Sequence, residues 1–551
     1  MTDAALGSAD QPAAPRKSAV DLDRKVHPSG IIVFALLIAA GLAFAGLNIF
    51  TDTRHVGETL TFAPFLFLGA ALLIALGFEF VNGFHDTANA VATVIYTHSL
   101  PPVFAVIWSG CFNFLGVIVS TGAVAYSVIT LLPVDLILNV GSAGGYAMIF
   151  ALLIAAVVWN LGTWWFGLPN SSSHALIGSI LGVGLANQLI ARGAGGTSGV
   201  EWSQARDVLL ALLVSPLMGF VGSFVLLFAM KRLVRNDKLY KEPEGKKPPP
   251  PIIRGLLVFT CTAVSFAHGG NDGQKGMGLI MLILIGVAPT AYALNRTMPD
   301  SSTPAFAQAT QAVGGVFTAH AQGRSIDPSK ARDVVSEALR KHDVTRPEVF
   351  AALGVMAPQI NQQVQQYGGV KHVPAAQTKN LRNDMYLIYD TLRLATKDKK
   401  ATEQAFPNGQ AKALTGYRDL LEKGTRFIPT WVKITVALAL GLGTMVGWKR
   451  IVVTVGERIG KMHLTYGMGA SAELVAAATI LLAQFKGMPV STTHILSSGV
   501  AGAAAANGSG LQWGTVRNIG MAWVLTLPAA MAIAGGLYWI FLTLVRAAGL
   551  T

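Results

Sequence analysis

The sequence FVNGFHDTAN at residues 80–89 returns in altered form as FAHGGNDGQK at residues 266–275. Both copies follow a run of apolar residues, and both place an aspartate, Asp86 or Asp272, close to glycine. A carboxylate at this position of an apolar run is costly, and here it is present twice. The two copies indicate an internal duplication of the chain.

A second pair of segments repeats in the same order. GLPNSSSH at residues 167–174 matches GMPVSTTH at residues 487–494. Each copy has a proline, then four residues of which the last three carry hydroxyls in both copies, then a histidine. Four matching segments in one order indicate two homologous halves, so the architecture should be a repeat.

The amino-acid composition is that of a membrane protein. Apolar residues make up 52% of the chain and charged residues 13%, whereas a soluble domain carries about 25% charged residues. Runs of the roughly 20 apolar residues that a span needs are Ile31–Phe50, Thr61–Val81, Val103–Ile129, Tyr146–Leu168, Val208–Met230, Gly276–Leu294, Trp431–Trp448, Gly467–Phe485 and Met521–Val545. Because lipid offers the backbone no hydrogen-bond partners, we predict an all-α polytopic membrane protein. The net charge of +13 is spread over loops, which argues against a nucleic-acid partner and suits the positive-inside rule.

These runs also predict the order of the parts of the chain. They are a polar N-terminal tail (1–30), an extra transmembrane helix (31–50), a first repeat (61–230), a basic cytoplasmic linker (231–254) and a second repeat (255–294 and 430–546) that holds a polar insertion (295–429), expected to be cytoplasmic. With a cytoplasmic tail and linker, the first repeat begins outside and the second inside, which is an inverted-topology arrangement. The two repeats can begin on opposite sides of the membrane only if one or more helices are broken or re-enter without crossing it. The insertion is either a small helical subdomain or a disordered linker.

The acidic clusters predict a cation centre inside the membrane. An ionisable residue there costs about 2.5–3.5 kcal/mol on insertion scales, so a matched pair, Asp86 and Asp272, indicates a site. The neighbouring glycines are expected to let the helices unwind and expose carbonyl groups that bind a cation with the carboxylate. A helix cap or surface loop would explain a single cluster, and the duplication favours a site. Glu79 either relays protons or faces an aqueous vestibule.

The hydroxyl triplets predict an anion site. A proline ends one helix and is tolerated at the start of the next. Each triplet then lies at a helix N-terminus, where hydroxyls, free N–H groups and the helix dipole all favour an anion. The triplets are Ser171, Ser172, Ser173 and Ser491, Thr492, Thr493. Ordinary N-capping is the simpler explanation of a single triplet, and the duplication again favours a site.

Two differences between the repeats concern the driving ion. Asn89 aligns with Lys275, and His85 aligns with Asn271. The fixed ammonium beside Asp272 can replace a cation such as sodium, and a histidine titrates near neutral pH. Both favour protons over sodium, although a lysine that reaches the membrane surface is an alternative for Lys275. Three further polar residues are expected to bond between helices; they are Asn113, Asn160 and Glu473.

The segments NGFHDTANAVATVIYT (82–97) and SFAHGGNDGQKGMG (265–278) resemble the two signature segments of the Pit-type inorganic phosphate transporters, with the closest likeness to the bacterial low-affinity branch. The resemblance covers both repeats. It implies inverted repeats around a central phosphate site, and proton symport of phosphate, either alone or as a neutral complex with Mg²⁺, Ca²⁺ or Zn²⁺. It also implies a multi-pass protein of the bacterial cytoplasmic membrane. We expect no cofactor and no enzyme activity, and a homodimer is left open.

Site residues follow from this resemblance together with the reasoning above. Those predicted to bind substrate are Ser171, Ser172, Ser173, Ser491, Thr492, Thr493, Asn271, Gln274 and Lys275. Those predicted to couple ions or protons are His85, Asp86, Asn89, Asp272 and Glu79. No dedicated metal ligand is predicted, because a metal would arrive with phosphate.

Four rival functions remain open at this stage. A permease for sulfate needs the same geometry. An aspartate, however, accepts hydrogen bonds, and this favours an anion that still carries protons, as phosphate does. A sodium-coupled phosphate symporter and a passive anion channel are two others. A membrane metalloenzyme would use His85, Asp86, His268 and Asp272 around a water-activating metal. The duplicated site speaks against the enzyme, since catalysis gains nothing from symmetry.

Overall fold

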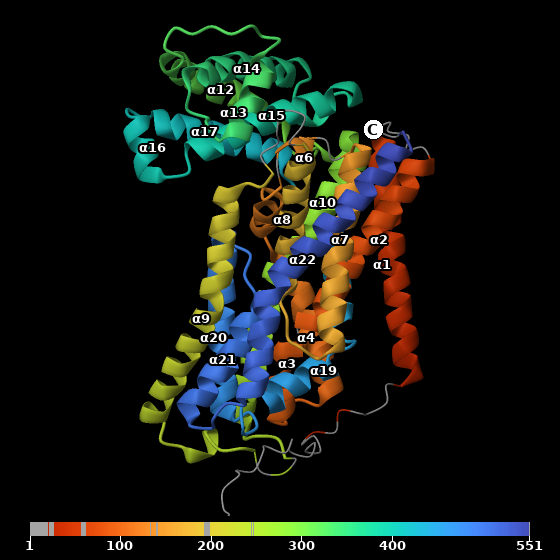
Figure 1. Ribbon diagram of the computed structural model, residues 1–551, viewed down its shortest axis with the longest axis vertical. Helices are drawn as coiled ribbons and strands as arrows, with labels where there is room; N and C mark the ends of the chain where they lie inside the picture. The colour runs from red at the N-terminus through yellow and green to blue at the C-terminus, as the bar shows by residue number, and fades with distance from the viewer. Residues whose placement is uncertain are drawn as a thin grey trace, which may run out of the picture.

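The fold is a bundle of long helices with a separate helical subdomain at one end (Figure 1). The computed structural model describes residues 20, 22, 27–56, 62–86, 88–132, 134–138, 141–191, 199–243, 245 and 247–549. Most of the predicted N-terminal tail lies outside this part of the chain. Nine of the described helices are long and apolar enough to cross a membrane. The prediction of an all-α polytopic membrane protein is thereby confirmed.

The described residues of the first half contribute nine helices to the bundle. They are α1 (Pro28–His55), α2 (Phe62–Asp86), α3 (Ala88–Tyr96), α4 (Pro102–Val119), α5 (Ala123–Ile129), α6 (Val134–Leu138), α7 (Ala143–Trp165), α8 (Ser172–Ala191) and α9 (Trp202–Leu233). The predicted single run Val103–Ile129 is wrong, because α4 and α5 are separate. The chain turns between them at Gly122, whose φ of 90° suits glycine.

The second half supplies the rest of the bundle. Its members are α10 (Pro251–Val287), α11 (Pro289–Tyr292), α18 (Thr430–Thr444), α19 (Lys449–Val453) with a π-helical turn at Thr454–Arg458, α20 (Tyr466–Phe485), α21 (Thr492–Asn507) and α22 (Trp513–Ala547). The predicted linker is shorter than expected, since α9 extends to Leu233 and α10 begins at Pro251.

Helix α10 overturns the expectation that glycines unwind both acidic clusters. It runs without a break through the second cluster. Its glycines serve close packing instead: a Cβ at Gly269 would lie 2.1 Å from the carbonyl oxygen of Asn113 on α4. The first cluster does contain an interruption, because α2 ends at Asp86 and α3 begins at Ala88.

The two halves exchange packing partners crosswise. Helix α2 packs against α18 of the second half, and α10 packs against α4 of the first. Likewise α8 packs against α22, and α21 against α9. Glycines permit these contacts, since a Cβ at Gly83 of α2 would lie 2.2 Å from the carbonyl oxygen of Leu440 on α18. Such small-residue contacts bring helices together in lipid.

The polar insertion is a helical subdomain. Its helices are α12 (Thr303–His320), α13 (Ala331–Lys341), α14 (Pro347–Gln366), α15 (Ala375–Ala395), α16 (Lys399–Ala405) and α17 (Gln410–Thr425). They enclose their own apolar core, which includes Phe306, Phe317 and Leu353. Of the two alternatives left by the sequence, the structure therefore has the helical one.

The linker and the insertion lie at opposite ends of the bundle (Figure 1). The 37 residues of α10 separate them, and a straight helix of that length spans about 55 Å. The prediction that both are cytoplasmic is therefore wrong for one of them.

Candidate functional site

The site forms where two helical hairpins meet in the middle of the bundle. Helices α7 and α8 form one hairpin, and α20 and α21 form the other. The N-termini of α8 and α21 come together, with the rings of His174 and His494 4.4 Å apart. From this point the two helices run toward opposite ends of the bundle (Figure 1).

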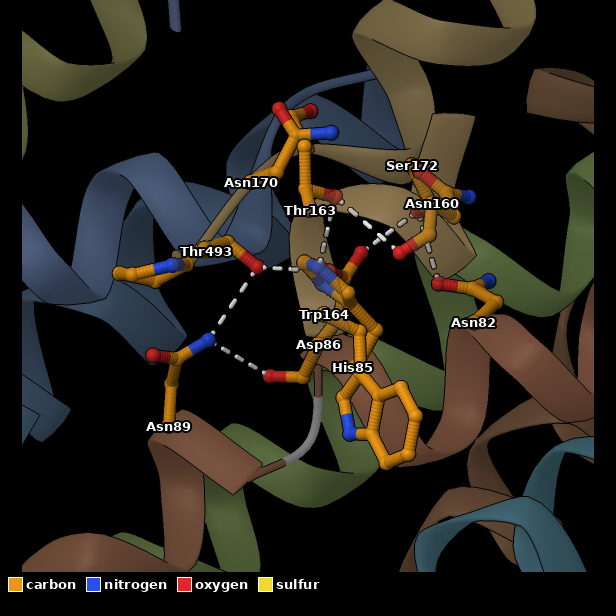
Figure 2. Close-up of polar contacts among 12 residues, drawn as sticks. Asn82, His85, Asp86, Asn89, Asn160, Thr163, Trp164, Asn170, Ser172 and Thr493 are labelled. Atoms are coloured by element: carbon orange, nitrogen blue, oxygen red, sulfur yellow. Dashed lines mark hydrogen bonds and ion pairs between the residues drawn. The ribbon is translucent and has the colours of Figure 1, made fainter. Parts of the chain in front are cut away.

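Asp86 is the hub of the first acidic cluster (Figure 2). Its carboxylate accepts a hydrogen bond of 2.5 Å from the Ser172 hydroxyl and one of 2.9 Å from the Thr493 hydroxyl. His85 Nδ1 lies 2.9 Å from the same carboxylate. Asn89 donates to the backbone oxygen of Asp86 and to the Thr493 hydroxyl. One aspartate thus joins hydroxyls from both triplets.

Glu79 connects to this hub through an amide. Ser172 Oγ also lies 2.7 Å from the Asn82 side-chain oxygen. The Asn82 amide nitrogen lies 3.4 Å from one Glu79 oxygen. Glu79 is fully buried and packs against Gly276 of α10, so it does not face an open vestibule.

Asp272 makes a different set of contacts. Its carboxylate lies 2.7 Å from the ammonium of Lys275 and 3.5 Å from His268 Nε2. Lys275 also donates to the Ser173 hydroxyl, which in turn donates to the Val490 carbonyl. Lys275 is fully buried, so the alternative of a lysine at the membrane surface is wrong.

The hydroxyl groups of a triplet differ in their hydrogen-bond partners according to their position in it. Ser171 and Ser491 accept hydrogen bonds from the backbone N–H of the histidine three residues later. They cap their own helices, so the simpler explanation is right for the first residue of each triplet. Thr492 Oγ1 is buried and has no partner among the described residues.

Two predicted ligands are occupied by backbone contacts. The Asn271 amide nitrogen donates to the Met488 carbonyl. The Gln274 side chain donates to the Gly270 carbonyl and accepts from the N–H of Val124. Gln274 therefore braces α10 against α5, and the prediction that it binds substrate finds no support in these contacts.

A cation could be held between the two clusters. Ligand atoms of Asp86, His268 and Asp272 lie within 4.8 Å of one another, and all three residues are buried. Imidazole nitrogen and carboxylate oxygen together suit a divalent metal. His268 was absent from the predicted transport site, yet its spacing of four residues from Asp272 on one helix face was visible in the sequence.

Asn160 is a polar residue whose place was predicted wrongly. It was expected to bond between helices, but both polar atoms of its buried amide lack a partner in the described part of the chain. Figure 2 places it beside Ser172. The Asn170 amide nitrogen is likewise buried without a partner. Glu473 does bond between helices, at 2.5 Å from the Thr260 hydroxyl.

Known proteins resemble this chain over most of its length. The family model described as the phosphate transporter family matches residues 82–534. The low-affinity inorganic phosphate transporter PitA of Escherichia coli (strain K12) is 40% identical over 520 residues, which cover 91% of this chain and 99% of PitA. PitB of the same strain is 39% identical over 521 residues, with the same coverage.

One more distant relative and one solved structure also match. A probable low-affinity inorganic phosphate transporter of Bacillus subtilis (strain 168) is 28% identical and covers 85% of this chain and 95% of its own length. The solved structure titled "The sodium-dependent phosphate transporter" is 19% identical with a TM-score of 0.47, over 87% of this chain and 100% of that one. At this level the structural match adds nothing about fold or driving ion.

Proposed function

Since the chain belongs to the phosphate transporter family, we propose that it imports inorganic phosphate by symport with protons through the site between its two hairpins. It is a multi-pass membrane protein that transports inorganic phosphate, as predicted, and it is not an enzyme. The driving ion, the form in which phosphate travels and the residues that bind it are the proposed part.

The convergence of four motifs carries this proposal. Ser172 and Thr493, from opposite halves, donate to the same carboxylate of Asp86. Ser173 of the first half meets Lys275 of the second. The hydroxyl donors, the N-termini of α8 and α21 and an ammonium therefore surround one buried place, which suits an anion.

The ion pairs that the aspartates already form favour protons over sodium as the driving ion. The Lys275 ammonium lies where a bound cation would neutralise Asp272. His85 lies between Asp86 and the Thr163 hydroxyl, at 2.9 Å and 3.3 Å, so a proton can pass between imidazole and carboxylate. Glu79, Asn82 and Ser172 extend this chain of polar groups.

A divalent metal that accompanies phosphate has a place in the same site. We assign it to Asp86, His268 and Asp272, whose ligand atoms lie close enough to share an ion. Carboxylates and imidazole would hold the metal while the hydroxyls and Lys275 hold phosphate oxygens. The neutral pair would cross a low-dielectric centre at lower cost than a bare anion.

The crosswise packing supports inverted repeats that alternate access to the site. Helices α2 and α10 take exchanged partners, α18 and α4. The basic linker, with eight Lys or Arg against three acids in 231–254, favours a cytoplasmic position. The helical subdomain, at the other end of α10, then lies outside the cytoplasmic membrane.

The test is phosphate uptake into proteoliposomes with pH, sodium and Mg²⁺ varied separately. We expect uptake that follows an inward proton gradient, collapses with a protonophore and ignores sodium. Steep dependence on sodium at fixed pH would overturn proton coupling. An unchanged rate under tenfold excess of sulfate would exclude a general oxyanion permease.

A further inference from the structure

The helical subdomain contains a buried arginine for which the described part of the chain offers no carboxylate partner. Arg382 of α15 is 7% exposed, and its Nε has no hydrogen-bond partner among the described residues. Its Nη1 donates to the Asn383 side-chain oxygen, 3.1 Å away, and its guanidinium lies 5.0 Å from the ring centre of Tyr386. Burial lowers the pKa of Arg382 to about 10, so the group remains charged at neutral pH.

The surrounding charges leave Arg382 uncompensated. Arg393 is paired with Asp390 at 2.7 Å, and Arg426 with Glu422 at 3.1 Å. Both nearby acids are thus taken by other arginines. The positive charge of Arg426 lowers the pKa of Arg382 further. Arginine is almost never buried unless it is paired, and of these three arginines Arg382 is the one without an ion pair among the described residues.

Other donors border the same cluster. The Arg426 guanidinium lies 4.2 Å from the ring centre of Tyr389 on α15 and 4.9 Å from that of Tyr126 on α5. The Tyr126 hydroxyl is buried and has no partner among the described residues. Arg382 and Tyr126 therefore bring two unused donors to the cluster around Arg426.

This cluster lies where the subdomain joins the transmembrane bundle. Tyr386, one turn after Arg382, belongs to the apolar core of the bundle, while Leu381 belongs to that of the subdomain. Helix α15 contacts α11 of the bundle, and Figure 1 shows it on the side of the subdomain that faces the bundle. An anion held there would lie between α15 of the subdomain and α5 of the bundle, which Arg426 joins.

We propose that Arg382, with Arg426 and the Tyr126 hydroxyl, forms a second binding site for a phosphate group, separate from the transport site. A planar guanidinium matches phosphate oxygens in a bidentate manner, and tyrosine hydroxyls donate to the same oxygens. The phosphate group can be that of free inorganic phosphate or that of an anionic lipid, because the cluster lies next to the membrane.

The test measures hydrogen–deuterium exchange of α15 in the full-length protein. The Asp86→Asn background removes the contribution of the transport site. In nonionic detergent, millimolar inorganic phosphate is expected to slow exchange in α15 at least about tenfold. A second arm adds phosphatidylglycerol without inorganic phosphate. Slowing in the first arm identifies free phosphate, slowing only in the second identifies lipid, and slowing in neither overturns the site.

Two substitutions localise the effect. Arg382→Met is expected to abolish the slowing and to raise the thermal midpoint in phosphate-free buffer, because it removes an unpaired buried charge. The matched control is Arg332→Met. Arg332 lies on α13 and forms an ion pair nearer the surface with Asp384 of α15, so this variant should preserve the slowing. Slowing that persists in Arg382→Met, or a lowered midpoint there, overturns the proposal.

If Arg382→Met fails to accumulate, the variant Arg382→Lys tests the proposed site instead. Lysine keeps the charge but cannot donate in the bidentate manner. We expect the half-saturating phosphate or lipid concentration to rise at least about tenfold. An unchanged half-saturation would show that the guanidinium does not bind the phosphate group.

Discussion

The two acidic clusters occupy matching positions in the repeats but use their aspartates differently. Asp86 ends a helix and accepts hydrogen bonds from Ser172 and Thr493, one from each half of the protein. Asp272 lies inside a continuous helix and pairs with Lys275 and His268 of that same helix. The two copies thus place an aspartate at matching positions, and the differences in sequence between them give the two aspartates different partners.

The spacing of these residues explains why only one cluster is interrupted. Lys275 and His268 lie three and four residues from Asp272, and such neighbours meet only when the helix is intact. At the first cluster, Asn89 donates to the backbone oxygen of Asp86. This contact satisfies a carbonyl group near the point where α2 gives way to α3.

Removal of the shared acceptor should have the largest effect. Asp86→Asn is expected to lower phosphate uptake at least about 100-fold, since an amide donates where Ser172 and Thr493 need an acceptor. Uptake of labelled phosphate into vesicles, normalised to the protein in the membrane, measures this. Normal transport in this variant would remove the proposed site.

Asp272→Asn should fail for another reason. It leaves the ammonium of Lys275 buried without a partner, and loss of one member of a buried pair costs about 3–5 kcal/mol. The protein should therefore lose abundance as well as uptake. Addition of Lys275→Gln should restore abundance but not uptake, whereas the same addition to Asp86→Asn should lower abundance, because Asp272 then loses its ammonium partner, and should not restore uptake. Equal behaviour of the two double variants would contradict the division of roles.

Lys275→Asn makes the second cluster resemble the first. Without the fixed ammonium, a sodium ion can take its place beside Asp272, so we expect proton-driven uptake to fall about tenfold and a dependence on sodium to appear. Initial rates with sodium or choline salts at constant pH measure the change. The exposed Lys461 serves as the control, since Lys461→Asn should leave both properties unaltered.

The hydroxyls that cross between halves should show an intermediate effect. Thr493→Val removes a donor to Asp86, and Ser173→Ala removes the partner of Lys275. We expect each to raise the half-saturating phosphate concentration about tenfold, the value of one charge-assisted hydrogen bond. A much larger effect of Ser173→Ala than of Thr493→Val would mean that the cluster around Asp272 contributes more to phosphate binding than the cluster around Asp86.

The capping serines should show the smallest effect. Ser171→Ala and Ser491→Ala remove N-caps from α8 and α21, which costs about 1 kcal/mol of stability. Uptake at saturating phosphate should change by less than about threefold. Thermal unfolding and uptake, measured on the same preparations, separate the two consequences. Loss of uptake without loss of stability would make these serines ligands.

Sequence reasoning predicted which polar residues come together more accurately than it predicted their individual contacts. The two triplets and two aspartates do meet, because motifs repeated in homologous halves take equivalent places. The contacts of Gln274 and Asn160 were not predicted, since polarity alone does not tell whether an amide bonds to the backbone, as at Gln274, or has no partner among the described residues, as at Asn160. No alternation or spacing distinguishes these two cases in advance.

The sequence by itself determined that the chain is an all-α membrane protein with a duplicated polar motif, because hydropathy and repeats are local properties. Only the tertiary structure decided that α10 is continuous, that the linker and subdomain lie at opposite ends, and that Ser172 and Thr493 share one carboxylate. These features depend on which helices pack together across the two halves. That choice is made by close contacts such as Gly83 against Leu440, which no single segment specifies.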